Sequence, residues 1–258
     1  PAPARFGVLA TRDREGAREA AMLNARLQAA ELSDLGITVD CVPALDLHMP
    51  GADAVIGDRA FSSDPDVVAL LGRAVCEGML AGGVLPVVKH MPGHGRAAVD
   101  SHHALPVVDT ARSELEATDF RAFAALADAP WGMTAHVVYS AIDADAPATT
   151  SRRVVDQVIR GFIGFDGVLV SDDLSMQALQ GGLAERATAA LAAGCDVALH
   201  CNGRADEMSA VAAVVPPLSE QARRRLAAAA ARVAPPPRAD LAAMRTRFDG
   251  LLAGGAPQ

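Results

Sequence analysis

The feature that most constrains the fold of this chain is a regular alternation of short apolar runs with longer amphipathic segments. The apolar runs predict strands at residues 37–47, 84–88, 131–138, 167–170 and 196–201. The amphipathic segments predict helices at residues 16–35, 65–81, 112–128, 151–162 and 184–193. Strands that alternate with helices pair in parallel beneath those helices, so the pattern predicts an α/β fold with a parallel sheet.

Polar residues gather directly after several of these strands, and this is where (β/α) barrels place their active sites. A TIM-like (β/α) barrel is therefore favoured, with residues 1–258 as one domain, because barrels of about 250 residues are ordinary single domains. The alternative is a doubly wound open sheet, which calls for a glycine-rich turn after its first strand, and no G-x-G-x-x-G occurs. After Cys201 no convincing strand follows, and residues 219–233 and 240–252 predict helices.

Composition excludes several classes of function. A net charge of -8 and an aromatic content of 3% argue against nucleic acid, which calls for basic patches and stacking rings. No apolar stretch is long enough for a membrane span, and the opening residues have no export signal. The four cysteines form no C-x-x-C pair and are too few for a disulfide scaffold, so a cytoplasmic location is expected.

Three clusters of reactive side chains follow predicted strands. They are Lys89-His90-Met91-Pro92-Gly93-His94-Gly95 with Asp100-Ser101-His102-His103, then Thr134-Ala135-His136, then Ser171-Asp172-Asp173-Leu174-Ser175-Met176. The four histidines of the first cluster raise the possibility of a metal site. A zinc helix needs H-x-x-x-H on one helical face, and Pro92 with Gly93 removes that face, so no metal is expected. Neither a G-x-S-x-G elbow nor a P-loop is present.

These clusters, read in order as K-H-M-P-G-H-G, D-S-H, M-T-A-H-V, G-F-D-G-V-L-V-S-D-D-L-S-M and A-G-C-D-V-A-L-H-C-N, carry a resemblance. Together they resemble the β-N-acetylglucosaminidases of glycoside hydrolase family 3 that act in bacterial peptidoglycan recycling. The match runs from about Pro1 to Asn202. It implies a TIM-like barrel, an aspartate nucleophile, a histidine acid/base on a mobile loop, and no cofactor.

The resemblance assigns catalytic roles position by position. Asp172, the first aspartate of S-D-D-L, matches the nucleophile, and Asp173 is the weaker candidate, better suited to capping a helix. His102 matches the acid/base, and Asp100 matches the group that orients it. His103, the next residue, is the alternative acid/base.

Arg59, Lys89 and His90 match positions that bind sugar hydroxyls and neighbouring polar groups. For each of them a structural salt bridge is the alternative. Asn202 and His136 rank lower as candidates. His94, Gly93 and Gly95 are expected to shape their loop rather than to react.

Members of the resembled family begin with two further strands and an acidic Asp-Gln-Glu-Gly-Gly-Arg-type segment. We therefore expect the N-terminal strands of the barrel, about 60 to 70 residues, to be absent from this chain. In that case the strand at residues 37–47 should lie at an open edge of the sheet with exposed apolar side chains.

The expected function is that of a retaining exo-β-N-acetylglucosaminidase, which removes terminal, nonreducing N-acetylglucosamine from muropeptide fragments. Its partner would be this small amino-sugar substrate, and a monomer is favoured. One alternative is a family 3 β-glucosidase or a phosphorolytic variant. A second alternative is an inactive barrel fragment that binds sugar without turnover.

Overall fold

The computed structural model describes residues 1–233 and 239–254, and its main element is a five-stranded parallel sheet. The strand order is β1-β2-β4-β6-β7. These strands are β1 (Val39–Asp40), β2 (Leu85–Met91), β4 (Trp131–Thr134), β6 (Val168–Asp173) and β7 (Val197–Leu199). All neighbouring pairs in this sheet are parallel, which confirms the predicted α/β fold.

The two faces of the sheet are covered differently. Val88 and Leu169 belong to the large core that also contains the buried helix residues. Val87 and Val170, on the opposite face, form a separate small cluster with Met133, and the half-buried side chains around it also come from strands or from Cys41. Helices therefore pack on one face, as in the wall of a barrel, and this arrangement does not fit the doubly wound alternative.

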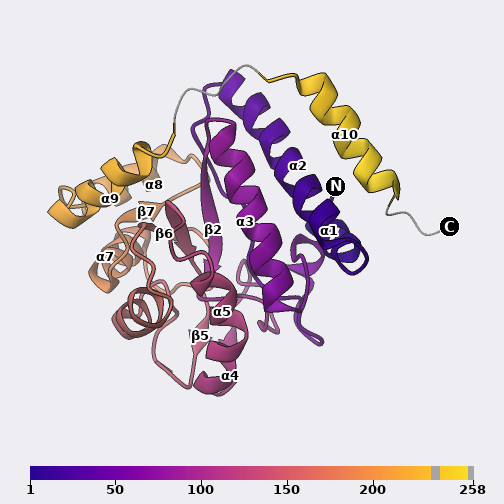
Figure 1. Cartoon of the computed structure of the whole chain (residues 1–258). Helices are drawn as coiled ribbons and strands as arrows, with labels where there is room; N and C mark the ends of the chain where they lie inside the picture. Colours follow the sequence, from indigo (N-terminus) through magenta and orange to yellow (C-terminus); the bar gives the residue numbers. More distant parts are fainter. Residues whose placement is uncertain (234–238, 255–258) are drawn as a thin grey trace.

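The covering helices are arranged along the chain as Figure 1 shows. They are α1 (Pro3–Ala10), α2 (Arg14–Asp34), α3 (Pro65–Ala81), α4 (Arg112–Ala117), α5 (Asp119–Ala124), α6 (Arg152–Val154), α7 (Leu183–Ala193), α8 (Ala205–Ala212), α9 (Glu220–Ala230) and α10 (Leu241–Gly254). Helix α2 packs against α3 on one side, and α10 lies beside α2 far from α9 (Figure 1). None of the helices in the described part of the chain is long and apolar enough to cross a membrane.

Side chains cap the helices where the sequence places them. Asp13 accepts a hydrogen bond from the Gly16 N–H at the start of α2, and Asp64 accepts one from Asp66 at the start of α3. Pro65 occupies the first helical position of α3, where its missing N–H costs no hydrogen bond. These caps explain why the predicted helix starts are close to the observed ones.

Strand β1 lies at one edge of the sheet and β7 at the other, within the described residues. The predicted edge position of the first strand is confirmed. The predicted exposure of its apolar side chains is confirmed only in part. Ile37 is 41% exposed, but Val39 and Cys41 are half-buried, and Leu45 belongs to the main core.

Three predicted strands were too long, and the one at 196–201 is observed only as β7 (Val197–Leu199). The segment 37–47 forms only β1 and a single later bridge between Ala44 and Lys89, because Pro43 has no N–H to donate to the ladder. The segment 131–138 ends as β4 at Thr134. Its last residue then starts β5 (Val138–Tyr139), which pairs in parallel with β3 (Val107–Val108) as a separate two-stranded sheet.

Several helix predictions also need correction. The helix predicted at 112–128 is divided into α4 and α5 at Thr118, whose φ of -125° and ψ of -88° are not helical. The helix predicted at 151–162 begins as α6 and continues from Val155 to Phe162 as a π-helix. Helices α1 and α8 were not predicted, whereas α9 lies within its predicted range and α10 (Leu241–Gly254) ends two residues after its predicted range of 240–252.

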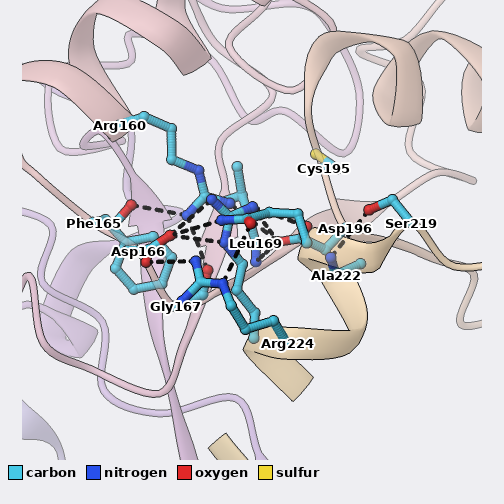
Figure 2. Close-up of polar contacts among 12 residues, drawn as sticks. Arg160, Phe165, Asp166, Gly167, Leu169, Cys195, Asp196, Ser219, Ala222 and Arg224 are labelled. Atoms are coloured by element: carbon cyan, nitrogen blue, oxygen red, sulfur yellow. Dashed lines mark hydrogen bonds and ion pairs between the residues drawn. The ribbon is translucent and has the colours of Figure 1, made fainter. Parts of the chain in front are cut away.

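An ionic cluster fastens α9 to the N-terminal ends of β6 and β7, part of which Figure 2 shows. Asp196, with 5% of its side chain exposed, pairs with Arg160 at 3.1 Å and with Arg225 at 3.0 Å. Asp166 pairs with Arg225 and with Arg224, each at 2.8 Å. This cluster lies at the opposite end of the strands from the polar residues considered next.

Candidate functional site

The candidate site lies at the C-terminal ends of the parallel strands. Lys89 and His90 are near the end of β2, His136 follows β4, and Asp172 lies near the end of β6. The carboxyl ends of parallel strands meet at one edge of a sheet, which brings these segments together. The Nε2 atom of His90 lies 3.9 Å from Oδ2 of Asp172.

The end of β6 is irregular where the two adjacent aspartates of S-D-D-L lie. Val170 pairs with Val197 and Asp173 pairs with Leu199, so the register of β6 against β7 shifts between Val170 and Asp173. A bulge of this kind interrupts the regular alternation of side chains between the two faces of a sheet. The two carboxylates are therefore distinguished by their contacts.

Asp173 is engaged in local structure. Its Oδ1 atom accepts hydrogen bonds from the N–H groups of Ser175 at 3.0 Å and Cys201 at 3.2 Å. Its Oδ2 atom accepts one from the Ser175 hydroxyl at 2.5 Å. These bonds hold the turn after β6 and tie it to the end of β7. Asp173 caps no helix, because the next helix, α7, begins at Leu183.

Asp172 is a mostly buried carboxylate surrounded by potential cations. Only 16% of its side chain is exposed, and its Oδ1 atom accepts the N–H of Asp173 at 2.8 Å. Burial raises the pKa of Asp172, but the charge of His90 and the backbone hydrogen bond outweigh burial and leave the pKa below its ordinary value. The group is therefore ionised near neutral pH.

Asp46 links the two histidines of the K-H-M-P-G-H-G loop. Its side chain is fully buried, with Oδ2 at 2.7 Å from Nδ1 of His90. Its Oδ1 atom accepts the backbone N–H of His90 at 3.2 Å and of His94 at 2.6 Å. The sequence pattern placed Asp46 only near the end of the strand predicted at residues 37–47, although an acidic residue at the end of a strand was a usable signal.

His136, which ranked low in the sequence, is completely buried beside the site. Its Nε2 atom donates to the carbonyl of Asp173 at 3.0 Å, and its Nδ1 atom lies 2.7 Å from Oγ1 of Thr149. Burial lowers the pKa of His136, which favours the neutral imidazole. The residue thus contacts the backbone of the segment that carries Asp172.

His102 and Asp100 form a pair on the loop after β2. The Nδ1 atom of His102 lies 2.7 Å from Oδ1 of Asp100, which also accepts the His102 backbone N–H at 2.8 Å. The His102 side chain is 58% exposed, and within the described residues no hydrogen bond or ion pair joins it to Asp172. His103 is 80% exposed and its Nε2 atom is 3.9 Å from Asp100.

The loop of His102 is anchored through its neighbour Ser101. The Ser101 side chain is buried, and its hydroxyl lies 3.0 Å from Nε2 of His94. His94 therefore connects Asp46 to the loop that carries the His102–Asp100 pair. This connection agrees with the prediction that His94 shapes its loop.

Arg59 lies in a short 3-10 helix (Gly57–Arg59). It lines a cavity of about 260 Å³ together with Lys89, Cys41 and the apolar side chains of Phe6 and Phe61. One guanidinium nitrogen of Arg59 donates to the carbonyl of Val55 at 3.1 Å. Arg59 and Lys89 thus share one cavity, whereas no hydrogen bond or ion pair joins Arg59 to His90 or Asp172 within the described residues.

Gly95 allows the K-H-M-P-G-H-G loop to approach the chain after β1. A Cβ atom on Gly95 would lie 2.1 Å from the carbonyl oxygen of Leu47. No side chain can fit at that distance, so close backbone contact explains this glycine.

Among the described residues, no three His, Cys, Asp or Glu side chains are arranged to hold a metal ion.

Comparisons with known proteins all identify the same family. The profile of the "Glycosyl hydrolase family 3 N terminal domain" matches residues 1–235. A "Beta-hexosaminidase" of Chromobacterium violaceum is 43% identical over 208 residues, which are 79% of this chain and 58% of that relative. A "Beta-hexosaminidase" of Pseudomonas aeruginosa is 44% identical over 207 residues, covering 78% of this chain and 61% of that protein. The chain thus spans about three fifths of the length of these curated relatives.

Solved structures show the same fold. NagZ from Neisseria gonorrhoeae, in complex with N-trifluoroacetyl-D-glucosamine, matches 98% of this chain and 75% of its own, with a TM-score of 0.86 and 35% identity. A glycoside hydrolase family 3 β-N-acetylglucosaminidase from Paenibacillus sp. matches all of this chain and 47% of its own, with a TM-score of 0.75 and 33% identity. The five-stranded sheet is accordingly a curled parallel half-barrel of the (β/α) type.

Proposed function

Because the chain belongs to glycosyl hydrolase family 3, we propose that it acts as a retaining exo-β-N-acetylglucosaminidase with Asp172 as its nucleophile. The observation that carries the proposal is the environment of Asp172. Its carboxylate is ionised and mostly buried, and its Oδ2 atom lies 3.9 Å from Nε2 of His90. A retaining glycosidase needs such a fixed, charged carboxylate at a strand end.

In the first step, an oxygen of Asp172 would attack the anomeric carbon and form a glycosyl ester while the glycosidic bond breaks. His102, as the imidazolium, would give its proton to the leaving oxygen. In the second step, neutral His102 would take a proton from water, whose oxygen attacks the same carbon and releases Asp172. Two displacements at one carbon give net retention.

Asp100 would orient His102 in this mechanism. Its carboxylate occupies Nδ1 of the ring at 2.7 Å, which leaves Nε2 for the leaving oxygen. Burial raises the pKa of Asp100, but the backbone and side-chain hydrogen bonds of His102 leave it below the ordinary value. Asp100 therefore remains ionised and can stabilise the imidazolium.

Lys89, His90 and Arg59 would bind the sugar. Lys89 and His90 precede the active-site loop, and Lys89 shares a cavity with Arg59. Arginine and lysine can donate to several hydroxyl oxygens at once, which suits a polar sugar. The similar gonococcal NagZ structure holds N-trifluoroacetyl-D-glucosamine, which supports an N-acylated amino sugar as the ligand.

We further propose that the substrates are muropeptide fragments released in peptidoglycan recycling and that the protein works in the cytoplasm. The four cysteines are all free, and such thiols persist in a reducing compartment. No cofactor or metal is required by the two-step chemistry.

The test is turnover of aryl glycosides by the purified chain. We expect release of the phenol from an N-acetyl-β-glucosaminide and retention of the anomeric configuration by NMR. Preferred turnover of the glucoside would indicate a family 3 β-glucosidase instead, and a glycosyl phosphate formed with added phosphate would indicate a phosphorolytic variant. Sugar binding without turnover would identify a binding fragment and refute the proposal for this chain.

A further inference from the structure

In the part of the chain that the structure describes, Arg186, near the start of α7, donates only to backbone carbonyls. Its Nη1 atom lies 2.7 Å from the carbonyl oxygen of Leu174 and 3.0 Å from that of Met176, and its Nε atom lies 3.0 Å from that of Gly181. Within the described residues Arg186 forms no ion pair with a carboxylate, so its bonds fix backbone geometry rather than balance a charge.

These three carbonyls belong to one segment, residues 174–181, which follows Asp172 and Asp173 directly. We call it the 174–181 loop. The loop has little regular structure, yet Leu174, Met176, Ala178 and Leu179 are buried. A loop of this kind leaves carbonyl groups unsatisfied unless a donor reaches them. Arg186 is that donor at both ends of the loop.

The 174–181 loop in turn holds the segment that carries His102. The N–H of Ala178 donates to the carbonyl of Ser101 at 3.2 Å, and the N–H of Gln177 lies 3.4 Å from the carbonyl of His102. One hydrogen bond thus joins Arg186 to the carbonyl of Met176, and a second joins the next residue, Gln177, to the backbone of His102. It is also joined by one hydrogen bond to Leu174, two residues after Asp172.

We propose that Arg186 is a positioning residue that sets the distance between the acid/base loop and the nucleophile. The inference rests on the proposed function, because His102 and Asp172 must act on the same glycosidic bond. Without the guanidinium, the 174–181 loop would lose three fixed carbonyls, and the His102 backbone would lose the rigid support beneath it. The planar fork of Arg186 explains the choice of residue, since a lysine ammonium cannot reach three carbonyls with the same geometry.

The test compares Arg186→Met and Arg186→Lys with Arg160→Met. Methionine keeps the apolar stem and removes the donors. Arg160 is the matched control because it also donates to two backbone carbonyls, those of Phe165 and Gly167, but at the other end of β6. Its loss should lower thermal stability without moving the acid/base loop.

The kinetic readout is kcat/KM for an activated aryl N-acetyl-β-glucosaminide and for an unactivated alkyl one. A misplaced general acid slows the unactivated substrate more, because an activated leaving group needs little protonation. For Arg186→Met we expect the alkyl value to fall about tenfold or more and the aryl value to fall by less than about threefold, as for an acid misplaced by about 1 Å. Arg186→Lys should lie between this variant and the wild type. Arg160→Met should keep the wild-type ratio of the two substrates.

Hydrogen exchange gives a second readout that needs no turnover. Amides of residues 100–104 and 174–181 should exchange faster in Arg186→Met, whereas Arg160→Met should leave them unchanged. This outcome would support the structural link even if the chain proved inactive, so failure of the proposed function can be told from failure of this inference. Unchanged exchange in both segments, or the same change of substrate ratio in Arg160→Met, would overturn the inference.

Discussion

The Nδ1 atom of His90 lies 2.7 Å from Oδ2 of Asp46, a carboxylate with no exposed surface. Burial raises the pKa of Asp46, but His90 and the backbone N–H of His94 outweigh burial and bring it to about 2. The charge of Asp46 is thus held in the interior by the loop that it orders. The stability of that loop should depend on this one ionisation.

Asp46→Asn should therefore destabilise the protein in a pH-dependent way. The pKa of Asp46 is about 2 in the folded protein and 3.8 ordinarily. The ionised group therefore stabilises the fold fully above pH 3.8, and this stabilisation is lost as the pH falls through the folded pKa. The difference in unfolding free energy between wild type and variant should shrink by about 2 kcal/mol between about pH 4 and pH 2. Urea denaturation measures it. A pH-independent difference would contradict the ionised role, and Asp34→Asn, at the exposed end of α2, is the control.

Asp172→Asn should abolish glycoside turnover by several orders of magnitude while the fold remains intact, because the amide cannot form the glycosyl ester. Circular dichroism checks the fold, and mass spectrometry with a slow fluoroglycoside should locate the adduct on Asp172. A label on Asp173 would correct the assignment. Asp173→Asn should mainly affect stability, since its oxygens accept hydrogen bonds from Ser175 and Cys201.

His102→Ala should slow unactivated glycosides far more than activated aryl glycosides, by a factor on the order of 10² to 10⁴ for the poor leaving groups. His103→Ala is the matched control, because His103 is 80% exposed and farther from Asp100. We expect it to have little effect on either substrate. The reverse ranking would identify His103 as the acid/base, and an equal loss for both substrates in His102→Ala would leave His102 a positioning role only.

Gly95→Ala should destabilise the protein by at least about 1 to 3 kcal/mol, the usual range for forcing extra volume into a packed site. The added Cβ would overlap the Leu47 carbonyl, whose distance is 2.1 Å. Gly250→Ala, on α10, has no atom within 4 Å of the new carbon and should stabilise by about 0.5 to 1 kcal/mol. Thermal denaturation compares the two. Equal stability of wild type and Gly95→Ala would mean that the loop can move away from Leu47.

Much of the fold follows from local pattern. The five main strands and the long helices α2 and α3 could be predicted because apolar periodicity and caps such as Asp64 are local properties. The break at Thr118 and the ending of β4 at Thr134 could not be. They depend on long-range contacts, such as the pairing of Asp119 with Arg96 at 2.7 Å and the hydrogen bond from the Thr149 N–H to the Ala135 carbonyl.

The sequence predicted the reactive side chains of the candidate site but not the residues that hold them in place. Asp172, His102 and Lys89 lie in motifs that can be read directly from the chain. Asp46 and Arg186 act through partners far along the sequence, namely His90 and Leu174, and no local spacing reveals such pairs. The position of His102 relative to Asp172 also depends on loop packing, which periodicity does not describe.

The two ends of strand β6 carry different kinds of polar residues. The ionic cluster around Asp196 holds the residues before Val168 and also the N–H of Leu169, whereas Asp172 and Asp173 lie three and four residues beyond Leu169, about 10 to 13 Å away along an extended strand. Changes separated by more than about 10 Å usually have additive effects on free energy. Substitutions at Arg160 and Arg225 should therefore change the thermal stability of the protein without changing the carboxylate that we propose as the nucleophile.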